Sequence, residues 1–261
     1  MDLTVVDSFT DRPFAGNPAA VAVVDGFPED GRMQVVAREM NLSETAFVVP
    51  RADGCHDLRW FTPTVEVELC GHATLAAAHV LGGARRFHTR SGELACVPAE
   101  DGWIEMDFPS TPSTAEVAPP ALAAALGLGA GAEPAVRAYA RAGADILVEL
   151  ADADTLRRLH PDLGAIAALG SRCVIVTAAG DRTGIDCVSR VFAPNAGIPE
   201  DPVTGSAHCT LAVYWGERLG RDQLVGEQAS ARGGVVRMRR NGDRVVLGGQ
   251  AITVSEVRLL A

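Results

Sequence analysis

Lysine is absent from this chain of 261 residues, because all 23 of its basic residues are arginines. Several classes of enzyme need the amine of a lysine. A pyridoxal-phosphate aldimine and a Schiff-base aldolase both bond to one covalently, while a phosphate-binding loop and a Ser–Lys nucleophile pair use one directly. These classes are therefore excluded.

Positive charge is also scarce in this sequence. The 23 basic residues face 33 acidic ones, which gives a net charge of −10. Nucleic-acid binding needs a clustered basic surface. We therefore expect no nucleic-acid partner.

Two kinds of apolar segment are missing as well. No stretch reaches the roughly 18 consecutive apolar residues that span a bilayer. The first residues, Met1-Asp2-Leu3-Thr4, lack the charged and apolar regions of a secretion signal. The six cysteines show no CxxC spacing, which is typical of reduced, mostly buried thiols. We expect no membrane partner and a cytoplasmic protein.

An internal repeat is present. The pattern Arg-x-Phe-x-Pro occurs at residues 59–63 and again at residues 190–194. Each copy is followed by a short polar segment that opens an apolar stretch, Cys70-Gly71-His72-Ala73 in the first case and Thr204-Gly205-Ser206-Ala207 in the second. A repeat with so long a period indicates two similar domains rather than a solenoid. We predict two pseudo-symmetric halves, residues 1–118 and 119–261, with the active site in the cleft between them.

Local patterns predict an α+β fold. Short alternating or β-branched segments are typical of strands, and they occupy residues 3–9, 19–24, 46–49, 58–61, 235–238, 244–247 and 252–257. Residues 29–40 have the apolar spacing of a surface helix. Residues 109–134, rich in Pro, Ala, Ser and Gly, predict a linker with a short helix at 120–126.

Two further segments predict buried helices. Residues 73–81 carry no charge, residues 207–219 are apolar until Glu217, and both stretches stop at glycine. A helix that is apolar on all sides must be surrounded by protein. We therefore expect each half to be a curled β-sheet around a central apolar helix.

Three short segments place polar side chains where chemistry is possible. In the first, Asn41-Leu42-Ser43-Glu44-Thr45 opens directly into the apolar strand predicted at residues 46–49. A carboxylate that enters a buried strand loses part of its hydration, which suits Glu44 to proton exchange near neutral pH. The alternative is a glutamate that caps a helix or faces water at a strand edge.

The second segment precedes the first buried helix. Gly71 permits a tight turn, and the free amides at the start of the helix can bind an anion or an enolate oxygen. His72 can exchange protons or donate a hydrogen bond to a substrate. The alternative is a core histidine with its hydrogen bonds satisfied.

The third segment precedes the second buried helix. Asp201 stands before a proline, which favours an extended backbone and lets the carboxylate lie over the helix N-terminus. Gly205 and Ser206 offer backbone amides, and Thr204 or Ser206 offers a hydroxyl. An ordinary helix cap is equally compatible with these residues.

Other chemical motifs are missing. The sequence has no G-x-G-x-x-G after a strand, no phosphate loop and no G-x-S-x-G. His72 and His79 have no third ligand at metal spacing, so we expect no metal. Two helix N-termini beside acid/base groups suit proton abstraction next to a carboxylate, where an enolate needs stabilisation.

The order of the motifs resembles the PhzF-like phenazine-biosynthesis isomerase family. The resemblance extends from about residue 2 to the C-terminus. It rests on Asp7-Ser8-Phe9, Phe14-Ala15-Gly16-Asn17-Pro18-Ala19, the segment from Asn41 to Phe47, Phe61-Thr62-Pro63 with Cys70-Gly71-His72-Ala73-Thr74, Phe192-Ala193-Pro194 through to Ala207, and Gln228 with Arg232-Gly233-Gly234.

This resemblance implies a diaminopimelate-epimerase-like fold and a cofactor-independent isomerase, with a homodimer as a family-level expectation. The namesake reaction of the family moves a proton along the ring of trans-2,3-dihydro-3-hydroxyanthranilate. On the matching positions, Glu44 would shuttle the proton. The other implied site residues would bind or polarise a small carboxylate-bearing substrate; they are His72, Asp201, Ser206, Gly71, Gly205, Asn17 and Thr204.

Related epimerases and racemases with this fold use two thiols, one from each half. Cys70 stands at the first thiol position, but Thr204 stands at the second, and one thiol cannot run a symmetric two-base reaction. A route through Glu44 is therefore preferred. A racemase or epimerase of an amino or hydroxy acid, and a non-catalytic small-ligand binding protein, remain as alternatives.

Overall fold

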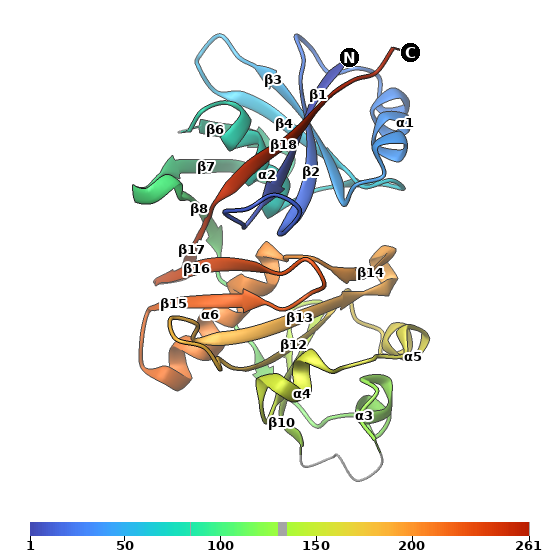
Figure 1. The fold of residues 1–261 in the computed structure, drawn as a ribbon, viewed down its shortest axis with the longest axis vertical. Helices are drawn as coiled ribbons and strands as arrows, with labels where there is room; N and C mark the ends of the chain where they lie inside the picture. The colour runs from blue at the N-terminus through green and yellow to red at the C-terminus, as the bar shows by residue number, and fades with distance from the viewer. Residues whose placement is uncertain (84, 130–134, 261) are drawn as a thin grey trace. The chain divides into compact units, whose positions relative to one another are not determined.

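The computed structural model describes residues 1–83, 85–129 and 135–260. The chain forms two compact units, one made of Met1–Phe108 with Val246–Ala261 and the other of Pro109–Val245 (Figure 1). The bounds of these units differ from those of the expected halves in two places. Residues 109–118 belong to the second unit instead of the first, and residues 246–261 belong to the first unit instead of the second. Residues 130–134 of the predicted linker lie outside the described residues.

The first unit is built on mixed strand pairings. Strand β1 (Asp2–Ser8) is antiparallel to β2 (Asn17–Val23) and to β18 (Ala251–Arg258). Strand β4 (His56–Phe61) is antiparallel to β3 (Glu44–Pro50) and to β5 (Glu66–Val67). Strand β7 (Gly92–Pro98) is antiparallel to β6 (Arg85–Thr89) and to β8 (Ile104–Pro109). Parallel pairs join β2 to β3 and β4 to β6. The helices are α1 (Asp30–Met40) and α2 (Gly71–Val80).

The second unit repeats these pairings in the same order. Antiparallel pairs join β10 (Val136–Ala142) to β11 (Asp145–Leu150) and to β9 (Thr114–Ala115), β12 (Val174–Ala179) to β13 (Cys187–Ala193), β13 to β14 (Ile198–Asp201), and β15 (Gln223–Gln228) to β16 (Gly234–Asn241). Parallel pairs join β11 to β12 and β13 to β15. The helices of this unit are α3 (Leu122–Ala125), α4 (Ala153–Arg157), α5 (Leu163–Ala168) and α6 (Gly205–Leu219). Strand β17 (Arg244–Gly249) begins in the second unit and continues into the first.

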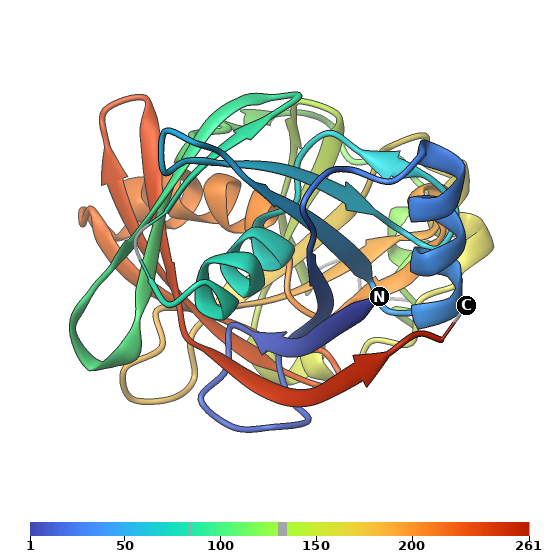
Figure 2. The same cartoon turned by 90° about the horizontal axis from the view of Figure 1, so that it is seen from above.

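Each unit holds an apolar helix against its strands, so the predicted α+β fold class is confirmed. Helix α2 packs against β1, β2, β3 and β18 (Figure 2). Its residues Ala73 and Leu75–Ala78 are completely buried. Helix α6 packs against β15 and β16 of its own unit.

Among the described residues, no helix has the length and apolar character needed to cross a membrane. All six cysteines are thiols.

The repeated Arg-x-Phe-x-Pro motif has the same structural role in both units. Arg59 forms a two-pronged ion pair with Glu66 on β5, with both N–O distances 2.7 Å. Arg190 does the same with Glu200 on β14, at 2.8 and 2.9 Å. Each guanidinium also lies over the phenylalanine of its own motif, 5.2 and 5.0 Å from the ring centroid. The arginine therefore fixes the short strand that leads into the buried helix of its unit.

Candidate active site

Glu44 is the first residue of β3 and is only 8% exposed. Asn41 ends the preceding helix α1 in the left-handed conformation, with φ of 50° and its N–H bonded to the carbonyl of Ala37. This tight ending lets the strand begin three residues later. Glu44 lies opposite Ala19 on β2, and the fully buried Asn17 precedes Ala19 by two positions, so both belong to the same face of the sheet.

His72 is the second residue of α2 and is 5% exposed. Its Nε2 lies 3.1 Å from Oε2 of Glu44, and its Nδ1 lies 3.4 Å from Sγ of Cys70. The hydroxyl of Ser8 donates a 2.8 Å hydrogen bond to the His72 carbonyl and holds the backbone at this point. The imidazole ring therefore lies between a carboxylate and a thiol, all of them buried.

The close approach of Glu44 and His72 leaves both groups with unused bonding capacity. Oε2 and Nε2 do not meet the angles of a full hydrogen bond, and neither atom has another hydrogen-bond partner among the described residues. Buried polar atoms are normally satisfied. Such a pair is well suited to bond to a polar group of a substrate.

The charge state of His72 follows from its neighbours. Burial disfavours the charged ring, but Cys70 and Glu44 stabilise it and together hold the pKa of His72 well above its ordinary value. Burial also raises the pKa of the Cys70 thiol. A carboxylate–imidazolium pair at this place can take up and return a proton.

The same three residues could hold a metal ion, since one ligand atom from each lies within 4.8 Å of the others. However, the two ring nitrogens of His72 face different partners, the carboxylate on one side and the thiol on the other. Ligands of one ion must converge on a single point. The arrangement therefore suits a proton relay better than a metal centre.

The corresponding part of the second unit is the N-terminus of α6. Thr204 is the N-cap residue, Gly205 begins the helix, and Ser206 follows it. The Thr204 hydroxyl donates a 2.5 Å hydrogen bond to Oδ2 of Asp201, the last residue of β14. The predicted residues Asp201, Thr204, Gly205 and Ser206 are thus brought together at one helix end. A helix N-terminus favours anions, because its first backbone amides have no partner within the helix.

Arg172 was not expected from the sequence, yet it also lies at this helix end. Its Nη2 lies 3.3 Å from the Ser206 hydroxyl, and its guanidinium pairs with the buried carboxylate of Asp145. The only sequence signal was its place just before the apolar run that starts at Cys173. The register of β12 on β13 matches that of β3 on β4 and aligns Cys173 with Glu44, so the second unit has a thiol where the first has its carboxylate.

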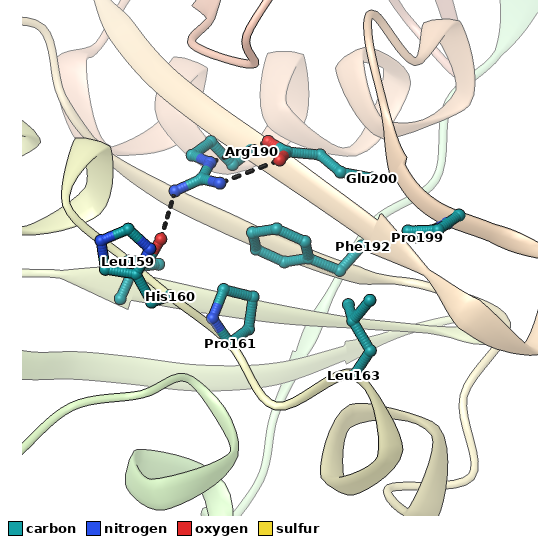
Figure 3. A pocket seen from close by; sticks show the side chains of 8 residues that line it. All are labelled: Leu159, His160, Pro161, Leu163, Arg190, Phe192, Pro199 and Glu200. Atoms are coloured by element: carbon teal, nitrogen blue, oxygen red, sulfur yellow. Dashed lines mark hydrogen bonds and ion pairs between the residues drawn. The ribbon is translucent and has the colours of Figure 1, made fainter.

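A cavity of about 280 Å³ in the second unit lies apart from these groups. Its walls are Leu159, His160, Pro161, Leu163, Arg190, Phe192, Pro199 and Glu200 (Figure 3). Arg190 is already committed, because Nε and Nη2 bond to Glu200 and Nη1 donates to the Leu159 carbonyl at 2.8 Å. None of the predicted site residues lines this cavity. We therefore interpret the cavity as space left beside the ion pair of Arg190 and Glu200.

Two repeated α+β units, each with a buried helix whose N-terminus carries polar side chains, define a diaminopimelate-epimerase-like protein. The chain belongs to the PhzC-PhzF family of phenazine biosynthesis-like proteins, whose family model matches residues 6–257. The resemblance seen in the sequence motifs is therefore confirmed.

Individual relatives cover nearly the whole chain. A protein of Pseudomonas aeruginosa named an uncharacterized isomerase is 48% identical, over 96% of each chain. The crystal structure of a PhzF-family protein of Enterococcus faecalis is 39% identical, with a TM-score of 0.90 over 98% of this chain and 97% of the other. A structure from Pseudomonas aeruginosa described as a predicted epimerase is 26% identical, with a TM-score of 0.76 over 100% and 99%. These relatives agree with the prediction of an isomerase.

Proposed function

We propose that the protein is a cofactor-independent isomerase that moves a proton on a small carboxylate-bearing substrate. The observation that carries this proposal is the buried pair of Glu44 and His72, 3.1 Å apart at the N-terminus of α2. The isomerase name of a relative that is 48% identical supports the same reaction class.

Glu44 is the proposed acid/base. Its carboxylate removes a proton from a carbon of the substrate, the electron pair of that C–H bond moves into a shifted double bond, and the proton is returned to another carbon. His72, protonated near neutral pH because its pKa is raised, stabilises the carboxylate and donates a hydrogen bond. The first amides of α2, which begins at Gly71, stabilise the oxygen on which negative charge develops.

The second unit supplies substrate binding in this proposal. The amide of Gly205 and the hydroxyl of Ser206 bind the anionic group of the substrate at the N-terminus of α6. Asp201 and Thr204 bind and polarise its other polar groups. Asn17, on the strand next to Glu44, contributes to binding in the first unit.

A racemase with two opposing bases is less well supported. Cys70 is the N-cap of α2, but Thr204 is the N-cap of α6, so the pair of thiols is incomplete. Cys173 aligns with Glu44, and burial raises the pKa of its thiol, so it is a poor base near neutral pH. The acid/base groups of the two units are therefore unlike, which favours an isomerase.

Solvent deuterium tests the proposal. A panel of small unsaturated and amino carboxylic acids, trans-2,3-dihydro-3-hydroxyanthranilate included, is incubated with the protein in heavy water and followed by NMR. An isomerase incorporates deuterium at carbon and shifts a double bond. Inversion at the labelled carbon would indicate an epimerase instead, and tight binding without any exchange would indicate a binding protein.

We further propose that the protein is cytoplasmic and that it is a homodimer, the second of which the family resemblance implies. Light scattering on the purified protein tests the assembly. A mass near twice 27.3 kDa supports the dimer, whereas a mass near 27.3 kDa contradicts it.

A further inference from the structure

Gln228 is a fully buried polar residue at the end of β15 that no motif of acid/base chemistry includes. Its side chain reaches the segment between β14 and α6. Oε1 accepts a 2.9 Å hydrogen bond from the backbone N–H of Thr204. Nε2 donates to the carbonyl of Asp201 at 2.6 Å and to the hydroxyl of Thr204 at 3.2 Å.

The partners fix the direction of every hydrogen bond in this group. An N–H can only donate and a carbonyl can only accept, so Thr204 N–H and Asp201 C=O together exclude the flipped amide of Gln228. The Thr204 hydroxyl accepts from Nε2 and is left with its own proton to donate. That proton goes to Oδ2 of Asp201, 2.5 Å away.

We propose that Gln228 is a positioning residue that acts through Thr204 and holds the carboxylate of Asp201 as a hydrogen-bond acceptor at the N-terminus of α6. The effect of Gln228 on catalysis rests on the proposed function, since Asp201 is a proposed substrate-binding group. A buried hydrogen-bond chain of this kind specifies one arrangement of its members. Gln228 therefore defines which way Asp201 faces before a substrate binds.

The charge of Asp201 also interacts with groups on neighbouring elements. Arg172 and Cys173 are two of these groups. Arg172 is already paired with Asp145. The hydrogen bonds that run from Gln228 through Thr204 to Asp201 are a separate contact from these.

Side-chain NMR tests the proposal without a substrate. The Nε2 proton and nitrogen signals of Gln228 are recorded near pH 7 in the natural protein, in Asp201→Asn, in Thr204→Val and in the double variant. We expect Asp201→Asn to shift these signals when Thr204 is present and to leave them unchanged in the Thr204→Val background. Thr204→Ser keeps the hydroxyl and restores the response. Equal shifts with and without the hydroxyl would overturn the proposal, because they would show that Asp201 acts on Gln228 by proximity alone.

A matched pair of variants measures the effect on the reaction. Gln228→Glu keeps the acceptor for Thr204 N–H but loses both donated bonds, and we expect it to lower kcat/KM for deuterium exchange by about 10- to 100-fold, as for loss of a buried hydrogen-bond partner. Gln223→Glu makes the same change at an exposed position of the same strand and should leave kcat/KM within about twofold. Equal activity of the two variants would refute the positioning role. Failure of the natural protein to exchange any substrate would refute the proposed function alone, since the NMR result does not depend on turnover.

Discussion

His208 makes the stability of the second unit sensitive to pH. It lies in the first turn of α6, is completely buried, and donates from Nδ1 to the carbonyl of Thr204 at 2.8 Å. Burial lowers its pKa from the ordinary 6.5 to about 4, with the bond to Thr204 opposing the shift in part. The folded protein therefore keeps this ring neutral at pH values where the unfolded chain already binds a proton.

The sign and size of the effect follow by linkage. Because the unfolded chain binds more protons between pH 6.5 and pH 4, acidification through this window destabilises the fold, and below about pH 4 the effect is complete. A shift from 6.5 to about 4 corresponds to about 3 kcal/mol in all, of which about 2 kcal/mol is lost between pH 7.5 and pH 5.

Urea unfolding at a series of pH values between about 4.5 and 7.5 measures this contribution. The free energy of unfolding of His208→Gln should fall less steeply with acid than that of the natural protein, by about 2 kcal/mol between pH 7.5 and pH 5. His160→Gln, a change at an exposed histidine, should follow the natural protein. If the free energy of unfolding falls equally with acid in His208→Gln and in the natural protein, the buried neutral histidine does not cause the loss of stability.

Three further substitutions test other parts of the structure. Gly16→Ala should lower the free energy of unfolding, measured by calorimetry, by more than about 2 kcal/mol, because φ of Gly16 is +63° and a Cβ would lie 2.1 Å from the Ser8 carbonyl oxygen. Gly26→Ala is the control and should change this free energy little, because a Cβ there meets nothing within 4 Å. Arg190→Gln should lower the free energy of unfolding, measured by thermal unfolding, by about 3 kcal/mol, because it leaves the Glu200 carboxylate without its arginine partner. Arg51→Gln, at an exposed ion pair, should lower it by under about 1 kcal/mol. Cys70→Ser should lower deuterium exchange by less than about tenfold, and a loss of a thousandfold would indicate that the thiol is the base.

Much of the fold could be predicted because its signals are local. Residues 73–81 carry no charge and residues 207–219 are apolar until Glu217, and these stretches form most of the helices α2 and α6. The repeated Arg-x-Phe-x-Pro motif reported the duplication because each copy needs the same ion pair with the strand that follows. The pairing of β18 with β1 had no such signal, since it joins the two ends of the chain.

The candidate site was predictable residue by residue but not as an arrangement. Glu44 and His72 were singled out separately, whereas their 3.1 Å approach depends on where β3 and α2 meet. Arg172 and Gln228 were not among the predicted site residues. Gln228 follows Thr204 by 24 positions, and no local pattern shows that a buried amide at the end of β15 reaches back to the segment before α6.

Deuterium exchange by Glu44→Gln tests the central claim most directly. The variant keeps the shape of the side chain but removes the acid/base, and the same change at Glu39→Gln, on the exposed side of α1, serves as its control. The substrate is the one that the natural protein labels in heavy water. We predict that Glu44→Gln exchanges its proton about 10²- to 10⁴-fold more slowly than the natural protein, and that Glu39→Gln exchanges it at the natural rate. Both variants should keep the circular dichroism spectrum of the natural protein. Full exchange by a folded Glu44→Gln variant would contradict the account.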